Sequence, residues 1–308
     1  MQQWREINAA QKVSVDGRDV PTANDEYFFY QTLIGSFPFR DEEYPQFVER
    51  MQQYIIKAIR EAKVHTAWLK PDSDYENAFT EFAQCVLKND TDNPFLEAFR
   101  PLQRKVQFYG VFNSLSQTLL KFTAPGVPDT YQGTELWDLS LVDPDNRRPV
   151  DYQIRQEYLQ DIKTQIETDL PSLLAQLQQN PEDGRIKLFL IYQLLQARNQ
   201  HLDLFQRGVY SKLTVAGSLK SHIVGFTREL GDKKIMAIAP RFFTSLIKEG
   251  EYPLGEKVWQ ETRIVPPAGS GAVWQDAIAG QQVQGEDTLW VRDILQQFPV
   301  ALLINQPN

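Results

Sequence analysis

Residues 124–152 read APGVPDTYQGTELWDLSLVDPDNRRPVDY, and this stretch carries the strongest indications of fold and function in the chain. It holds five Asp, one Glu and two adjacent Arg among aromatic and amide side chains. Its prolines and polar residues exclude a continuous helix, although helical patterns flank it on both sides. A long connection rich in ionisable and hydrogen-bonding groups is more typical of a binding loop than of a linker.

Outward from this stretch, the first 204 residues follow a helical pattern. Apolar residues recur at three- and four-residue steps over residues 47–62, which predicts an amphipathic helix. The sequence Ser73-Asp74-Tyr75-Glu76 predicts a capping box at the start of a second helix. Asn93-Pro94 predicts the start of a third helix, and residues 185–201 are apolar nearly all round. We therefore expect residues 1–204 to be mainly helical.

After Phe205 the pattern changes to short alternating segments separated by turn residues. Residues 222–227 and 235–239 flank Gly231-Asp232-Lys233, a sequence typical of a hairpin turn. Further strands are expected near residues 258–259, 263–265, 273–274, 288–291 and 300–303. The fold class is thus predicted as α+β and multidomain, with a boundary near residue 205 and an antiparallel β-sandwich over residues 205–308.

Composition narrows the classes of function. The 308 residues are long enough for two cores, and the formal net charge of −8 argues against nucleic-acid or anionic-membrane partners. The single cysteine, Cys85, is expected to be a buried thiol on a helix. Residues 1–6 lack the apolar core of a secretory signal, and no apolar run reaches the length of a membrane span. We expect a soluble, cytoplasmic protein.

No cofactor or metal is predicted. Three scattered His and one Cys show no metal-ligand spacing, and no phosphate-binding loop is present. Sugar hydroxyls, by contrast, suit the Asp and Arg side chains of residues 124–152, and the apolar face of a sugar suits an aromatic ring. Each residue also has a plainer interpretation. Arg147 and Arg148 could pair with Asp143 and Asp145 to hold the loop together, and Glu135 could accept backbone N–H groups.

The motif GVPDTYQGTE at residues 126–135 resembles the G-x-P-x-x-Y-x-G-x-E pattern of the α-amylase superfamily. Its continuation over residues 136–152 and the segment REAKVHTAW at residues 60–68 narrow the resemblance to the maltooligosyl trehalose synthase family of glycoside hydrolase family 13. The likeness extends from about Tyr27 to about Leu303. It implies that residues 126–135 form the eighth strand of a (β/α)8 barrel and the loop after it, at the face where barrel active sites lie. It also implies that residues 1–204 combine the last part of the barrel with a helical insertion.

That family converts the reducing-end α-1,4 linkage of a maltooligosaccharide into an α,α-1,1 linkage, a step of trehalose biosynthesis. The resemblance implies a retaining mechanism with two carboxyl groups about 5 Å apart. In the superfamily the nucleophile Asp, the acid/base Glu and a stabilising Asp follow earlier barrel strands. The His-Asp pair that marks the last of them is absent, because His65, His201 and His222 are each followed by another residue type. The resemblance therefore implies a C-terminal part without catalytic residues.

Family analogy and side-chain chemistry together predict a set of sugar-binding residues. Two alternatives stay open for His65 and Trp68, which could instead be a solvated helix-end histidine and a core aromatic. The three tryptophans of the predicted β domain, Trp259, Trp274 and Trp290, are expected to pack in its core. The predicted substrate-binding residues are Lys63, His65, Trp68, Tyr131, Glu135, Asp138, Asp143, Asp145, Asn146, Arg147 and Arg148.

Three interpretations compete at this point. The first is the C-terminal part of a glucan-rearranging enzyme, inactive alone, whose barrel is completed by an upstream chain. The second is a non-catalytic α-glucan-binding protein that uses the same loop as a clamp. The third assigns an acid and a nucleophile within this chain, for instance Asp138 with Asp143 or Glu135, and requires a new site beside an old loop. All three name a maltooligosaccharide or α-glucan as the ligand.

Overall fold

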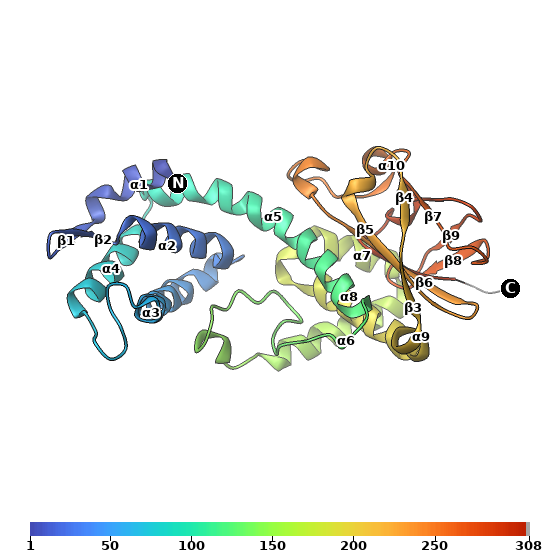
Figure 1. Ribbon diagram of the computed structural model, residues 1–308, viewed down its shortest axis with the longest axis horizontal. Coiled ribbons are helices and arrows are strands. Elements are labelled where there is room, and N and C mark those ends of the chain that lie inside the picture. The colour runs from blue at the N-terminus through green and yellow to red at the C-terminus, as the bar shows by residue number, and fades with distance from the viewer. Residues whose placement is uncertain (306–308) are drawn as a thin grey trace. The chain divides into compact units, whose positions relative to one another are not determined.

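The computed structural model describes residues 1–305 as helices, antiparallel strands and connecting loops (Figure 1). The chain forms two compact units. The N-terminal unit comprises Met1–Gln107 and Leu139–Pro149, and the C-terminal unit comprises Phe108–Asp138 and Val150–Asn308. Residues 124–152 are thus shared between both units. The predicted boundary near residue 205 is a different division, and it lies close to the point where helices give way to strands, at Val209.

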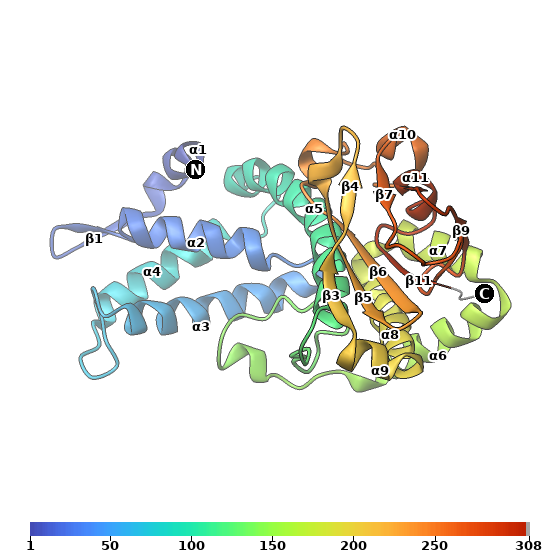
Figure 2. The same ribbon diagram turned by 45° about the vertical axis from the view of Figure 1, so that its right-hand side comes forward.

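Helices make up most of the N-terminal unit, together with one small hairpin. The strands β1 (Val13–Val15) and β2 (Arg18–Val20) pair antiparallel, and no pattern in the sequence had predicted them. The helices are α1 (Gln2–Asn8), α2 (Ala23–Ser36), α3 (Tyr44–Ala62), α4 (Ser73–Val86) and the first part of α5 (Pro94–Thr123). Figure 2 shows α2, α3 and α4 running side by side.

The core of this unit lies where the predicted apolar stripes meet. Phe47, Met51, Ile55 and Ile59 of α3 are buried, which confirms the stripe over residues 47–62. Aromatic rings from α2, α4 and α5 pack against them in one cluster, to which Leu141 of the quoted stretch also belongs. Residues 139–149 have no regular structure of their own beyond a short 3-10 turn at Asp145–Arg147. They belong to this unit because Leu141 is buried in its core.

The structure corrects two predictions on α4. The helix begins at the predicted place, but its N-cap is Asp72, whose carboxylate accepts a hydrogen bond from the Tyr75 N–H at 3.0 Å. Glu76 does not reach back to complete a capping box, because Arg60 and Thr66 bind its carboxylate. Cys85 is exposed rather than buried, since the buried stripe of α4 runs along the opposite side of the helix.

The C-terminal unit begins with the remainder of α5. After residues 124–138 it continues with four helices before the strands begin. Its helices are α6 (Tyr152–Thr168), α7 (Leu170–Gln179), α8 (Arg185–Gln200) and α9 (Leu202–Arg207). Helix α8 matches the predicted helix over residues 185–201, and most of its apolar side chains are buried. Among the described residues, no helix is both long and apolar enough to cross a membrane.

Two antiparallel sheets complete this unit and share one apolar core. The six-stranded sheet has the order β3-β5-β6-β11-β8-β9, and the three-stranded sheet has the order β10-β7-β4. The central hairpin of β5 (Ile223–Leu230) and β6 (Lys233–Pro240) turns at Gly231, as predicted. The other strands are β3 (Val209–Lys212), β4 (Thr214–Ala216), β7 (Arg263–Val265), β8 (Val273–Asp276), β9 (Gln282–Gln284), β10 (Leu289–Trp290) and β11 (Ala301–Asn305).

Some strand predictions were wrong. Residues 258–259 belong to the short helix α10 (Gly255–Trp259), and Val291 starts α11 (Val291–Ile294) instead of extending β10. Trp259 and Trp274 are fully buried, which confirms them as packing residues, whereas Trp290 stays partly exposed between Arg263 and Arg292.

Residues 126–135 contain no strand, although the resemblance implied a barrel strand there: residues 127–131 have no regular structure and residues 132–135 form a turn. A barrel strand needs parallel neighbours for its backbone hydrogen bonds. All the strand pairs in the described part of the chain are antiparallel, and they lie elsewhere in the sequence.

Candidate functional site

The loop after α3 presents three of the predicted site residues. Helix α3 ends at Ala62, and Lys63 adopts a left-handed conformation with φ of 57°, which turns the chain away from the helix axis. Ala67 and Lys70 then close the loop with two backbone hydrogen bonds of 3.1 Å. Between them Trp68 is 54% exposed and Leu69 is fully exposed.

Arg60 joins this loop to the next helix. Its guanidinium binds both oxygens of Glu76, at 2.8 and 2.6 Å, and also lies 5.0 Å from the centre of the Trp68 ring. These hydrogen bonds lower the pKa of the buried Glu76 carboxyl. Thr66 adds a third hydrogen bond to Glu76, at 2.5 Å. Trp68 is therefore held in one orientation while most of it stays open to solvent.

His65 is mostly buried against Tyr75 and Asp25. Its ring stacks on Tyr75 with 4.5 Å between centroids, and its Nε2 lies 3.8 Å from an Asp25 carboxylate oxygen. Tyr75 donates a hydrogen bond to the same oxygen, and burial raises the pKa of the Tyr75 hydroxyl. Because the His65 side chain is only 16% exposed, its main role in this structure is to connect α2, α4 and the loop.

Residues 139–149 are anchored to another part of α3. Asp145 is at the centre of this contact: it accepts a 2.7 Å hydrogen bond from the Leu141 N–H and pairs with Arg148 at 2.9 Å. From α3, Arg50 lies 3.5 Å from the Asp145 carboxylate and donates to the Leu139 carbonyl, while Lys57 donates to the Asp143 carbonyl.

The plainer interpretation of the two arginines thus agrees with the geometry. Arg147 pairs with Asp143 and Arg148 pairs with Asp145. Arg147 is largely exposed, whereas Asp145 is nearly buried. The Asn146 side-chain oxygen is buried without a hydrogen-bond partner among the described residues, so this loop leaves an unsatisfied acceptor.

Both groups lie along one side of α3. Arg50, Lys57 and Arg60 are seven and three residues apart, spacings that keep side chains within one arc of a helix, and they span about 15 Å along its axis. Helix α3 therefore brings eight of the eleven predicted residues to one unit, namely Lys63, His65, Trp68, Asp143, Asp145, Asn146, Arg147 and Arg148.

The other three predicted residues, Tyr131, Glu135 and Asp138, belong to the C-terminal unit. Tyr131 is about half exposed. Glu135 pairs with Arg155 of α6 at 3.2 Å, and Arg155 also donates to the Gly133 carbonyl at 2.8 Å. Glu135 is thus bound by a side chain and not, as the alternative had it, by backbone N–H groups.

Two cations in this second group were missed by the sequence analysis, Arg155 and Lys187. Lys187 of α8 donates to the Leu136 carbonyl at 3.3 Å, and its Nζ lies 5.5 Å from the centre of the Trp137 ring. Burial and then the nearby charge of Lys121 lower the pKa of Lys187 to about 8, against the opposing attraction of Asp138 and Glu135. The available signal was a single lysine among the apolar residues 186–191 of α8.

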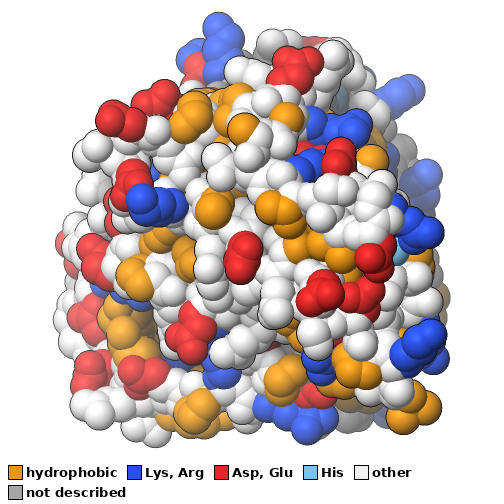
Figure 3. All heavy atoms as spheres, turned by 90° about the vertical axis from the view of Figure 1, so that its left-hand side faces the viewer, with side chains coloured by type: hydrophobic (Ala, Val, Ile, Leu, Met, Phe, Trp, Pro, Cys, Tyr) orange, Lys and Arg blue, Asp and Glu red, His pale blue; other side chains and the backbone are white. Residues whose placement is uncertain are grey.

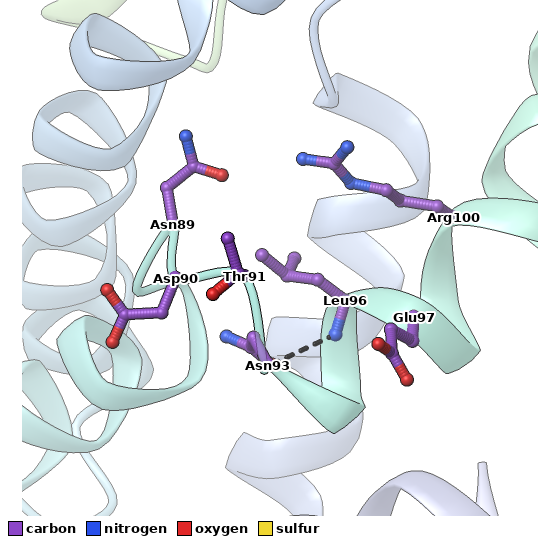
Figure 4. A pocket seen from close by; sticks show the side chains of 7 residues that line it. All are labelled: Asn89, Asp90, Thr91, Asn93, Leu96, Glu97 and Arg100. Atoms are coloured by element: carbon purple, nitrogen blue, oxygen red, sulfur yellow. Dashed lines mark hydrogen bonds between the residues drawn. The ribbon is translucent and has the colours of Figure 1, made fainter.

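A separate hollow of about 390 Å³ lies in the N-terminal unit and contains none of the predicted residues. Figure 4 shows the Arg100 side chain reaching toward it from α5, with Asn89 and Thr91 on the opposite wall. Asn93 on its floor caps α5 by accepting a hydrogen bond from the Leu96 N–H at 3.0 Å. Asp90 is drawn away by a 2.6 Å ion pair with Lys88.

The face of the molecule that Figure 3 draws, on the side of α1–α4, carries hydrophobic side chains in small groups separated by acidic and basic ones. Such a mixed surface suits a neutral ligand with both polar and apolar faces better than a nucleic acid. Among residues 1–305, no group of three or more His, Cys, Asp or Glu side chains is placed to hold a metal ion.

Comparison with known proteins finds similarity to maltooligosyl trehalose synthases both by sequence and by structure. The chain is 32% identical over 284 residues to a protein of Mycobacterium tuberculosis described as a "putative maltooligosyl trehalose synthase", which covers 92% of this chain and 32% of the relative. A search of family models found no match.

Solved structures agree. Maltooligosyltrehalose synthase from Arthrobacter ramosus superimposes with a TM-score of 0.73 at 27% identity, covering 99% of this chain and 35% of that one. A hypothetical maltooligosyl trehalose synthase from Sulfolobus tokodaii gives a TM-score of 0.65 at 28% identity and covers 34% of that chain. The chain therefore spans about a third of the length of these relatives.

Proposed function

The chain is related to the maltooligosyl trehalose synthases over nearly its whole length, and on this basis we propose that it supplies glucan-binding surface to such an enzyme. The reaction converts the reducing-end α-1,4 linkage of a maltooligosaccharide into an α,α-1,1 linkage. In this proposal the nucleophile, the acid/base and the third carboxylate belong to barrel strands outside these 308 residues, and an upstream chain provides them. The proposed setting is the cytoplasm.

The arrangement along α3 is the observation that carries this proposal. An exposed indole held by an arginine provides what a pyranose needs, an aromatic face for its C–H groups and charged donors at its edge. Lys63 follows directly after α3 and adds another donor on the same loop. In this role Trp68 and Lys63 contact sugar, whereas Arg60 and Glu76 position Trp68.

The carboxylates of residues 124–152 are better suited to holding a sugar-binding surface in place than to acting as nucleophile or acid. Glu135, Asp143 and Asp145 are each paired with an arginine. A retaining glycosidase instead needs two carboxyl groups about 5 Å apart, one of which is protonated. In the two pairs considered from sequence, Asp138 with Asp143 or with Glu135, the second carboxylate is already bound by Arg147 or by Arg155. We therefore assign residues 139–149 the task of shaping the sugar-binding surface and excluding water from the transferred glucose.

Reducing-end chemistry tests the proposal, because isomerisation removes the reducing end of maltohexaose without changing its mass. The chain alone should leave the reducing-end signal unchanged. The signal should fall when a fragment carrying the first two thirds of the Arthrobacter ramosus enzyme is added. Loss of reducing ends with the chain alone would place catalytic carboxylates within it.

Binding of maltohexaose by calorimetry gives the second part of the test. Trp68→Ala should weaken binding about 10-fold or more, in line with the loss of one stacking surface. Leu69→Ala, at the neighbouring and fully exposed position, is the matched control and should leave it unchanged. Binding that depends on Trp68, without any complementation by the upstream fragment, would favour a non-catalytic α-glucan-binding protein instead.

A further inference from the structure

Phe242, directly after β6, combines two unusual features. Its φ of 59° and ψ of 43° are left-handed, a conformation that bulky L residues avoid. Its side chain is also 55% exposed, so it contributes little to the core. A strained backbone and an exposed aromatic at the same residue point to a role outside the packing of the fold.

The backbone turn at this position has a structural reason. It directs the next residue, Phe243, into the core, where it is buried and lies 5.4 Å from the Phe112 ring. The Phe242 carbonyl then accepts hydrogen bonds from the N–H and hydroxyl of Ser245, at 3.1 and 2.9 Å. Glycine or asparagine would make the same turn with less strain. The fold thus accounts for the turn at Phe242 and leaves its phenyl ring unexplained.

The surroundings of the ring are polar and fixed. The Arg241 guanidinium lies 4.5 Å from the centre of the Phe242 ring, and its Nε donates to the Ser221 carbonyl at 2.8 Å. His222 meets the ring edge-on at 6.3 Å and shares a 3.1 Å hydrogen bond with the Ser245 hydroxyl. The Arg241 N–H also donates to the His222 carbonyl, at 2.8 Å. The aromatic face and its polar neighbours are therefore held in place before any ligand arrives.

We propose that Phe242, Arg241 and His222 form a second α-glucan-binding site, on the C-terminal unit. The exposed part of the phenyl ring stacks on the C–H face of a glucose residue, while Arg241, Ser221 and Ser245 meet its hydroxyls. The choice of an α-glucan as ligand rests on the proposed function. The site itself rests on the strained, exposed phenylalanine and its polar neighbours.

The test uses a substitution that relieves strain. Phe242→Gly removes the ring at a position where glycine is at ease, so the melting temperature should stay the same or rise. Maltohexaose should shift the amide NMR signals of residues 241–245 in the wild-type chain. Those shifts should be lost in Phe242→Gly and kept in the control Tyr210→Ser, which removes another half-exposed aromatic of the same unit.

The site would be overturned by wild-type signals at residues 241–245 that do not respond to maltohexaose, or by shifts that persist in Phe242→Gly. A melting temperature that falls by several degrees in Phe242→Gly would also count against it, because the ring would then serve the fold. The amide signals of residues 63–70 report separately on the proposed function. Shifts at residues 63–70 without shifts at 241–245 would rule out the second site alone. Shifts at 241–245 without shifts at 63–70 would rule out the site at Trp68.

Discussion

The Arg60 guanidinium contacts two side chains at once. Its N–H groups donate hydrogen bonds of 2.6 and 2.8 Å to the Glu76 carboxylate, and its Cζ lies 5.0 Å from the centre of the Trp68 ring. One side chain thereby links α3, α4 and the exposed tip of the loop between them. The stability of the N-terminal unit and the orientation of Trp68 therefore depend on the same ion pair.

Replacing Arg60 with methionine should destabilise the protein, because it leaves the Glu76 carboxylate, which is 7% exposed, without its charged partner. Urea unfolding measures this loss. The double variant Arg60→Met with Glu76→Gln should recover part of it, since the unpaired charge is gone. A double variant as unstable as the sum of the two single variants would show that the pair is not coupled.

The same pair sets a pH dependence. Because Arg60 lowers the pKa of Glu76 in the folded protein, the pair contributes stability above the ordinary carboxyl range and loses it as pH falls through the folded pKa. Melting temperatures of the wild type should therefore drop more steeply below about pH 4.5 than those of Glu76→Gln. Parallel curves for the two proteins would contradict this.

Asp276 should act in the opposite direction. It is fully buried in β8, its Oδ1 accepts a hydrogen bond from the Ile278 N–H at 2.9 Å, and burial raises its pKa from 3.8 to about 7. The folded state holds this proton while the unfolded state has released it, so stability falls as pH rises from about 4 to 7.

Asp276→Asn removes this titration while keeping the shape of the side chain. At pH 8 the variant should be more stable than the wild type by about 2–4 kcal/mol, and at pH 4 the two should be similar. Thermal unfolding at both pH values measures the difference. If the difference is the same at both values, the carboxyl is ionised in the fold and this account is wrong.

Much of the helical fold follows from local pattern. The stripe over residues 47–62 and the apolar run of α8 bury the side chains that their periodicity predicts. Local pattern was a poorer guide to the short elements of the C-terminal unit. Residues 258–259 look like a strand because Val and Trp favour strands, but Trp259 is buried at the end of a helical turn and donates to the Pro253 carbonyl. Tertiary packing overrode propensity there.

Sequence spacing predicted the ion pairs within the loop but not the contacts that distant helices make with it. The sequence placed Arg147 and Arg148 beside Asp143 and Asp145, and the i,i+4 and i,i+3 spacings produce those pairs. Arg50, Lys57, Arg155 and Lys187 come from distant helices, and no local spacing connects them to the loop. Their contacts follow from the fold, so only the structure reveals them.

Arg147 and Arg148 provide a matched pair for testing the loop. Arg148→Ala should cost about 1–2 kcal/mol, since it removes the partner of the nearly buried Asp145. Arg147→Ala should change stability by less than about 0.5 kcal/mol, because its pair with Asp143 is largely exposed. Amide hydrogen exchange at Leu141, which donates to Asp145, should accelerate in the first variant and not in the second. Equal effects would mean that Asp145 does not anchor the loop.

Lys187 allows a test of whether a residue of the candidate site lowers the free energy of unfolding of the protein. Its pKa is lowered from 10.5 to about 8, so the folded state disfavours the charged form, and stability should rise with pH between about 8 and 10.5. Lys187→Met keeps the length of the side chain and removes the buried charge. At pH 7 it should be about 1–2 kcal/mol more stable than the wild type, after the loss of the hydrogen bond to Leu136 is set against the relief of burial.

If Lys187 supports sugar binding near Trp137 and Glu135, the same variant should bind maltohexaose more weakly while it unfolds at a higher temperature, a trade-off expected at functional sites. Lys163→Met is the control. The Lys163 ammonium also lies 5.5 Å from the centre of an aromatic ring, that of Tyr192 on α8, but Lys163 is outside the candidate site. Calorimetric titration and thermal unfolding of both variants decide the question. Weaker binding with lower stability would assign Lys187 to the fold, and unchanged binding with higher stability would remove it from the candidate site.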